Sequence, residues 1–244
     1  MMNKKLVSAA VSTVLLTGMG AASVQAFDIS ANVALVSDYR FRGISQTGKD
    51  AAIQGGFDVS FEPGIYVGTW ASSVDFGDVT DGSGSYGTME IDYYAGWAGP
   101  IGDTDFAVDV GYAYYQYPGD TVDPKGDYQE FHVTPSWKDL SIGIVYSDDF
   151  YAKTGKYWYY SGDYSLTFAE DFSVGFHAGY NDFDKTDFLS NNQDSYTDYS
   201  ITLGYTFKGV DFSVAWVGTD LDDSDCWDSN ICDDTAVFSI SKSL

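Results

Sequence analysis

The sequence predicts an all-β fold: an antiparallel up-and-down β-barrel of about twelve strands that spans a bacterial outer membrane. Three observations support this prediction. Apolar and polar residues alternate in segments of roughly 9–12 residues, the length that a tilted strand needs to cross a bilayer. The connections between these segments are alternately short and long, as in outer-membrane barrels. Aromatic residues gather at both ends of the segments, where the two membrane interfaces would lie.

The first 26 residues have the features of a cleaved signal peptide. Two lysines precede a short apolar stretch from Leu6 to Met19, and residues 24–26 supply small side chains at the usual cleavage spacing. This stretch is shorter than the ~20 residues of a membrane-spanning helix. We therefore expect the mature chain to begin at Phe27 and residues 27–244 to form one barrel domain.

Period-two alternation is clearest at the start of the predicted mature chain, where Phe27, Ile29 and Leu35 share one face and polar side chains share the other. The predicted strands are residues 27–42, 52–61, 65–74, 89–98, 104–117, 127–137, 140–148, 156–168, 172–181, 196–207, 210–218 and 235–244. Their apolar faces carry no charge, which fits lipid contact because Lys or Arg at the bilayer midplane would cost about 2–4 kcal/mol. Pro135 predicts a strand end or a bulge.

The connections give the predicted barrel its orientation. Short turns are predicted at residues 62–64, 99–103, 138–139, 169–171 and 208–209, and longer polar loops at 43–51, 75–88, 118–126, 149–155, 182–195 and 219–234. Short turns are typical of the periplasmic side and long loops of the extracellular side. Because the strand number is even, we expect both termini of the barrel at the periplasmic side.

The charge balance limits the possible partners. The formal net charge is −24, and removal of the signal peptide with its two lysines would make it more negative. An acidic chain is poorly suited to nucleic acid, whose phosphates call for a basic face. It suits a surface or lumen that attracts cations. No sequence motif predicts a cofactor.

Side chains that alternate with the apolar faces are expected to line the lumen. The candidates for pore lining or constriction are Asp38, Arg40, Arg42, Glu90, Asp92, Asp109, His132 and His177. Arg40 and Arg42 lie two residues apart, so on one strand they would face an acidic wall together and form a charged constriction that selects ions. Alternatively, both arginines neutralise buried carboxylates and hold the barrel in shape. Barrels of about eight strands are filled by their own side chains, and barrels of about sixteen strands enclose an aqueous channel. A barrel of twelve strands lies between these cases, so a narrow pore is expected.

The last long loop contains both cysteines and several carboxylates. Cys226 and Cys232 are expected to form a disulfide, because an exported protein folds in an oxidising compartment. Asp220, Asp222 and Asp225 are weak candidates for a calcium site, but their spacing does not match the EF-hand pattern. A solvated acidic loop without a metal is the preferred interpretation.

The sequence does not predict an enzyme. It contains no G-x-S-x-G turn to present a nucleophilic serine. Its two histidines fall on the predicted lumen face, and neither stands in a recognisable Ser-His-acid arrangement. We interpret both histidines as pore-lining polar residues.

Several stretches are similar to the TorF-type porin family, also described as Gcw_chp-type proteobacterial outer-membrane proteins. The stretches are residues 32–47 (NVALVSDYRFRGISQT), 68–76 (GTWASSVDF), 90–97 (EIDYYAGW), 203–208 (LGYTFK) and 237–244 (VFSISKSL), so the resemblance extends over the mature chain. It implies an outer-membrane location and a porin role, without a settled substrate or a defined active site. The terminal Leu244 departs from the aromatic residue that barrel proteins usually carry there for recognition by the assembly machinery.

Together these features predict a porin-like channel for passive diffusion of small solutes or ions, narrow and cation-preferring. Its expected partners are outer-membrane lipids, lipopolysaccharide, small solutes or cations, and the barrel-assembly machinery through the C-terminal strand. The alternative is a closed structural or adhesive barrel without an open pore, in which inward tyrosines such as Tyr115, Tyr157 and Tyr159 fill the lumen.

Overall fold

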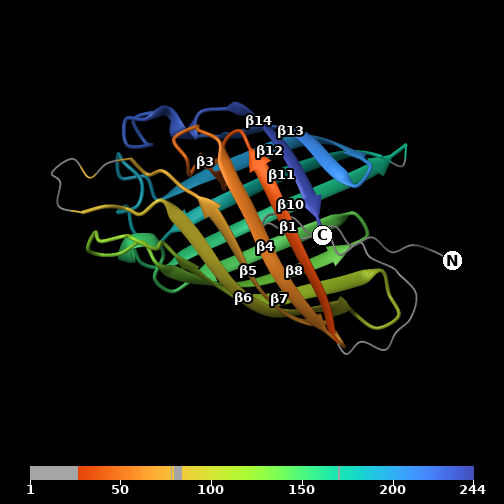
Figure 1. Ribbon diagram of the computed structural model, residues 1–244. Coiled ribbons are helices and arrows are strands. Elements are labelled where there is room, and N and C mark those ends of the chain that lie inside the picture. Colours follow the sequence, from red (N-terminus) through yellow and green to blue (C-terminus); the bar gives the residue numbers. More distant parts are fainter. Residues whose placement is uncertain (1–26, 78, 80–83, 170) are drawn as a thin grey trace.

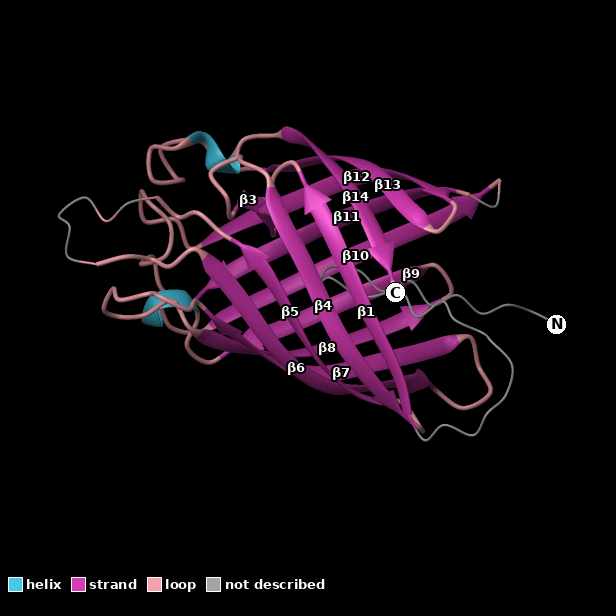
Figure 2. Cartoon of the chain, viewed as in Figure 1, coloured by secondary structure: helices cyan, strands magenta, loops and turns pink. Residues whose placement is uncertain are grey.

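The structure, a computed structural model, describes residues 27–77, 79, 84–169 and 171–244, and the predicted signal peptide lies outside these residues. Twelve antiparallel strands close into one barrel, with β1 paired to β14 (Figures 1 and 2). The barrel strands are β1 (Phe27–Val36), β4 (Ala52–Phe61), β5 (Ile65–Ser73), β6 (Met89–Pro100), β7 (Phe106–Gln116), β8 (Tyr128–Trp137), β9 (Leu140–Ser147), β10 (Tyr157–Phe168), β11 (Phe172–Phe183), β12 (Ser195–Phe207), β13 (Val210–Thr219) and β14 (Thr235–Ser243). The predicted fold class is confirmed.

In the part of the chain that the structure describes, four short elements lie outside the wall. β2 (Arg40–Phe41) and β3 (Ile44–Ser45) pair with each other, and the single-turn 3-10 helices η1 (Tyr151–Lys153) and η2 (Asn230–Cys232) lie in long loops. Within the described residues, no helix has the length and apolarity to cross a membrane. The long loops gather at one end of the barrel, and the chain ends of the first and last strands lie at the other (Figure 2).

The first strand is shorter than predicted: β1 ends at Val36 rather than at residue 42. Val36 still pairs with Ala52 of β4, so the wall continues directly from β1 into β4 and residues 37–51 leave it. Within these residues, Arg42 and Gly43 have φ values of 48° and 83° and form the left-handed turn between β2 and β3. We call residues 37–51 the plug segment.

Pro135 lies inside β8 and does not end it. It has no ladder partner on β9, although pairing resumes at Ser136–Ser141 in the same register as Val133–Ile144. The missing N–H of proline therefore interrupts the ladder locally without a bulge.

The outer face of the wall is apolar. Its exposed side chains include Ile29, Val33, Leu35, Ile53, Phe57, Val67, Phe131, Val133, Ile142, Phe176, Ile201, Leu203, Phe238 and Ile240. At the short-turn end, Lys138 lies over the ring of Trp137 and Lys208 over that of Phe207, which is a typical membrane-interface arrangement. An apolar band with an aromatic rim is the surface that a membrane-spanning barrel presents to lipid.

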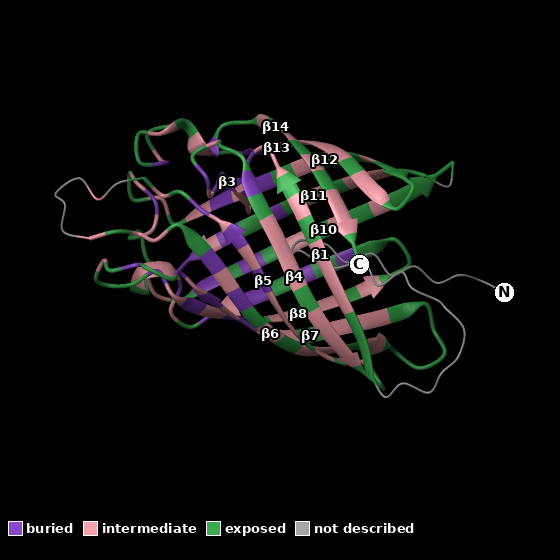
Figure 3. Ribbon diagram, viewed as in Figure 1, coloured by how far each residue is buried: buried purple, intermediate pink, exposed green. Residues whose placement is uncertain are grey.

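Burial is concentrated in the half of the barrel near the long loops (Figure 3). Tyr115 at the end of β7 and Tyr157 and Tyr159 at the start of β10 are at most 2% exposed. In the half near the short turns, most inward side chains are only partly buried. The barrel is therefore filled at one end and less tightly filled at the other.

Candidate functional site: the lumen and its plug

The plug segment folds into the lumen and contacts opposite walls. Tyr39 donates a hydrogen bond to Glu90 Oε1 on β6 (2.8 Å), and Tyr196 on β12 donates one to the carbonyl of Arg42 (3.0 Å). A side chain at Gly43 would overlap Thr219 on β13, so the backbone of the plug lies directly against that wall. These contacts place β2 and β3 across the lumen.

Arg42 fixes the plug to β8. Its guanidinium donates two parallel hydrogen bonds to the Glu130 carboxylate, at 2.7 and 2.8 Å, a geometry that makes a strong ion pair. The guanidinium also lies over the rings of Phe41, Tyr157 and Tyr159, at 4.4–5.0 Å from their centroids. The side chains of Arg42 and Glu130 are 5% and 3% exposed, so this ion pair is buried.

Arg40 joins the plug to the last long loop. Its Nε donates to Asp38 Oδ2 (2.6 Å) within the plug, and its Nη1 donates to the carbonyls of Ile231 (2.8 Å) and Asp233 (3.1 Å). The two predicted constriction arginines therefore lie in the plug, each paired with a carboxylate, rather than on a wall strand. This geometry favours the interpretation in which they neutralise buried carboxylates.

Cys226 and Cys232 form a disulfide in that same loop, and both are fully buried. Replacing both cysteines by serine is expected to lower the free energy of unfolding by about 2 kcal/mol, because the unfolded loop regains conformational freedom. Urea titration of the refolded protein in detergent measures this loss of stability. The folded fraction at each urea concentration is read from the gel band that shifts when the protein is heated. Ser229→Ala in the same loop is the control, and an unchanged midpoint for the serine variant would show that the disulfide does not hold the loop.

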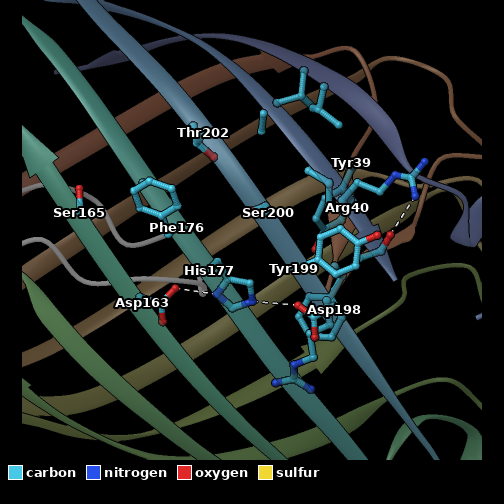
Figure 4. A pocket seen from close by; sticks show the side chains of 18 of the residues that line it. Tyr39, Arg40, Asp163, Ser165, Phe176, His177, Asp198, Tyr199, Ser200 and Thr202 are labelled. Carbon is cyan, nitrogen blue, oxygen red and sulfur yellow. Dashed lines mark hydrogen bonds and ion pairs between the residues drawn. The ribbon is translucent and has the colours of Figure 1, made fainter. Parts of the chain in front are cut away.

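His177 links three neighbouring strands inside the barrel. Its Nδ1 lies 2.6 Å from Asp163 Oδ1 on β10, and its Nε2 lies 2.8 Å from Asp198 Oδ1 on β12 (Figure 4). The Tyr159 hydroxyl is 2.9 Å from the same Nε2, and Asn181 donates to Asp198 Oδ2 (2.8 Å). His177 thus belongs to a polar network rather than standing alone in the pore lining.

His132 has a smaller set of partners. Its Nε2 lies 3.3 Å from Asp109 Oδ1, and Tyr66 donates a hydrogen bond to the same oxygen (2.8 Å). Both predicted lumen histidines are therefore adjacent to carboxylates from neighbouring strands.

A cavity of about 570 Å³ lies in the lumen beside the plug. The plug contributes Asp38 and the two arginines to its border, and the wall contributes Asp92, Asp163 and Asp198 together with His177. Within the described barrel strands, Lys242 is the only lysine, and it bonds to the Gly209 carbonyl at the short-turn end. The cavity border is therefore acidic apart from the paired arginines and His177.

Two of the three predicted calcium candidates, Asp220 and Asp225, accept hydrogen bonds in the loops through their carboxylates. Asp220 accepts from the backbone N–H of Thr197 (2.7 Å), and Asp225 accepts from Asn191 (3.2 Å). The Asn191 hydrogen bond holds the pKa of Asp225 below its usual range. Among the described residues, no three His, Cys, Asp or Glu side chains are arranged to hold a metal ion.

Comparison with solved structures identifies the same barrel fold in known porins. The KdgM porin aligns with a TM-score of 0.55 at 10% identity, covering 88% of this chain and 98% of its own. The NanC porin aligns with a TM-score of 0.53 at 12% identity, covering 88% and 98%. A further structure is described as KdgM porin in complex with disordered oligogalacturonate and has a TM-score of 0.53 at 10% identity, covering 88% and 97%. At these identities the likeness concerns the fold alone.

No curated protein matches the sequence. The profile of one protein family does, and it covers residues 20–244, nearly the whole chain. The narrower assignment to TorF-type porins stays a prediction. The chain belongs to the Gcw_chp family, described as bacterial proteins of unknown function.

Proposed function

We propose that the protein is an outer-membrane channel of the porin type, through which small solutes or ions diffuse passively, with a preference for cations. The observation that carries this proposal is the acidic cavity inside a closed barrel with an apolar outer face. Carboxylates along a low-dielectric passage raise the local concentration of cations and lower that of anions. The porin folds of KdgM and NanC support the same role.

The charge of the lumen sets the class of solute. A KdgM structure is described in complex with oligogalacturonate, a saccharide that carries one carboxylate per sugar unit. Asp92, Asp163 and Asp198 border the cavity of the present barrel and would repel such a ligand. Neutral or cationic solutes fit this lumen better, and the plug segment keeps the passage narrow.

The outer face, the loops and the last strand of the proposed channel indicate its partners in the membrane. Outer-membrane lipids would contact the apolar band, and lipopolysaccharide would contact the long loops. The assembly machinery would engage β14, the C-terminal strand. Export through a signal peptide that ends at Ala26 is part of the same proposal.

Swelling of liposomes that contain the refolded protein tests the solute class. Glucosamine, glucose and glucuronate have similar sizes and differ in charge, so their permeation rates report electrostatic selection. We expect glucosamine to enter fastest and glucuronate slowest, with the difference reduced at high salt because screening weakens the lumen field. Equal rates, or faster entry of glucuronate, would overturn the proposed cation preference.

A closed barrel is the second candidate, and the buried tyrosines favour it. Tyr115, Tyr157 and Tyr159 fill the loop-side half of the lumen together with the plug. A structural or adhesive role would then use the exposed acidic loops. Protein that is inserted and shows the heat-shifted gel band, but gives no swelling with any solute, would identify this candidate as correct.

A further inference from the structure

Three side chains form a row on the inner wall beside the plug. Asp92 of β6 pairs in register with Trp70 of β5 on one side and with Tyr115 of β7 on the other. All three border the lumen cavity. Tyr39 of the plug packs edge-on against Trp70, with ring centroids 5.4 Å apart, which holds the indole in place. The row therefore consists of one carboxylate between two aromatic rings.

Asp92 lacks the kind of partner that holds each of the two nearby glutamates. Glu130 is held by Arg42, and Glu90 accepts the hydrogen bond of Tyr39. Asp92 is 5% exposed, forms no salt bridge within the described part of the chain, and its Oδ1 is buried without a hydrogen-bond partner. Leaving a buried carboxylate unpaired is costly, so a positive group that reached it would be stabilised.

We propose that Asp92, with Trp70 and Tyr115, forms a binding subsite for the ammonium group of a small organic cation in the lumen. The carboxylate would pair with the positive charge, while the two rings would contact its methyl or methylene groups through cation–π attraction. This inference rests on the proposed channel function and deepens it, because it names the chemical class of cation and the point where it binds.

The composition of the row distinguishes an organic ammonium from a metal ion. Calcium takes six to eight oxygen ligands, and magnesium requires a nearly octahedral set. Asp92 supplies one carboxylate, and the nearest inward neighbours on the adjoining strands are aromatic. Aromatic faces attract weakly hydrated ammonium groups, which makes alkylammonium the better match.

Calorimetric titration of the refolded protein in detergent with choline chloride tests the subsite. The matched neutral ligand is 3,3-dimethyl-1-butanol, which has the same shape without the charge. We expect saturable binding of choline, and at least tenfold weaker binding of the neutral alcohol. Asp92→Asn is expected to weaken choline binding about tenfold, a loss of about 1.4 kcal/mol. Asp187→Asn, in an exposed loop, is the control and should bind choline like the wild type.

Two further variants keep the test decisive. Trp70→Leu should weaken choline binding severalfold while leaving Asp92 in place, and Asp92→Glu should retain part of the affinity. If Asp92→Asn fails to fold, the wild-type comparison of choline with its neutral analogue and the Trp70→Leu titration still decide the matter. Equal binding of choline and the alcohol, unchanged binding in Asp92→Asn, or complete competition by equimolar calcium would overturn the proposal.

Binding and permeation can fail separately. Choline binding without any liposome swelling would leave the subsite standing in a closed barrel. Swelling without choline binding would leave the channel standing and remove the subsite.

Discussion

Arg42→Gln is expected to lower the free energy of unfolding by about 3–5 kcal/mol, because it leaves the Glu130 carboxylate buried without its cation. The same change removes the guanidinium from the rings of Tyr157 and Tyr159, so the plug also loses these contacts with β10. Urea titration of the heat-shifted band measures the change in stability. We also expect larger and noisier conductance, since a loosened plug no longer holds one position.

A double-mutant cycle separates the ion pair from general damage to the lumen. Glu130→Gln alone should also be destabilising, because it leaves a buried guanidinium unpaired. The double variant Arg42→Gln/Glu130→Gln should then be more stable than the sum of the two single effects predicts. Lys153→Gln, at a side chain that is 59% exposed, is the control for loss of a positive charge. Strict additivity in the cycle would contradict a direct, buried pair.

Excision of the plug is expected to widen the channel while leaving the barrel intact. Val36 of β1 pairs with Ala52 of β4, so residues 38–50 can be replaced by an Asn-Gly turn that joins the two strands as a tight hairpin. The wall ladder is unaffected, whereas the contacts of Tyr39 and Arg42 across the lumen disappear. Single-channel conductance should rise severalfold, and solutes too large for the wild type should enter liposomes.

The control for this excision places the same turn at the other end of the barrel. Lys208 and Gly209 already form a two-residue turn with φ values of 50° and 71°, so Lys208→Asn produces Asn-Gly there without touching the lumen. Its conductance should equal that of the wild type. An excised protein that folds and conducts no more than the wild type would show that the plug is not the constriction.

The sequence predicts the wall well because lipid imposes a simple rule on it. Outward positions within the hydrocarbon region must be apolar, so period-two alternation appears in segments such as residues 172–181, and short turns separate such segments on one side. The same rule does not predict that the plug segment leaves the wall. Tyr39 and Phe41 alternate with Asp38 and Arg40 as they would in a strand, so the pattern extends past Val36, where the strand ends. Contacts with residues far along the chain hold this segment in the lumen.

Part of the candidate site can be predicted from the sequence, because a short turn fixes the register of the two strands that it joins. The turn between β10 and β11 is short, and pairing Phe168 with Phe172 aligns Asp163 with His177, so that contact could have been predicted. Asp198 follows a long loop, whose length leaves the register of β12 undetermined. The partners of Arg40 and Arg42 lie on the last loop and on β8, and local pattern gives no information about such distant pairs.

Planar-bilayer recording of the refolded protein across a potassium chloride gradient tests the central claim most directly. The account predicts discrete conductance steps and a reversal potential displaced toward the equilibrium potential of potassium, because carboxylates such as Asp92, Asp163 and Asp198 border the lumen cavity. Folded, inserted protein that gives no steps, or steps whose reversal potential lies toward that of chloride, would contradict it.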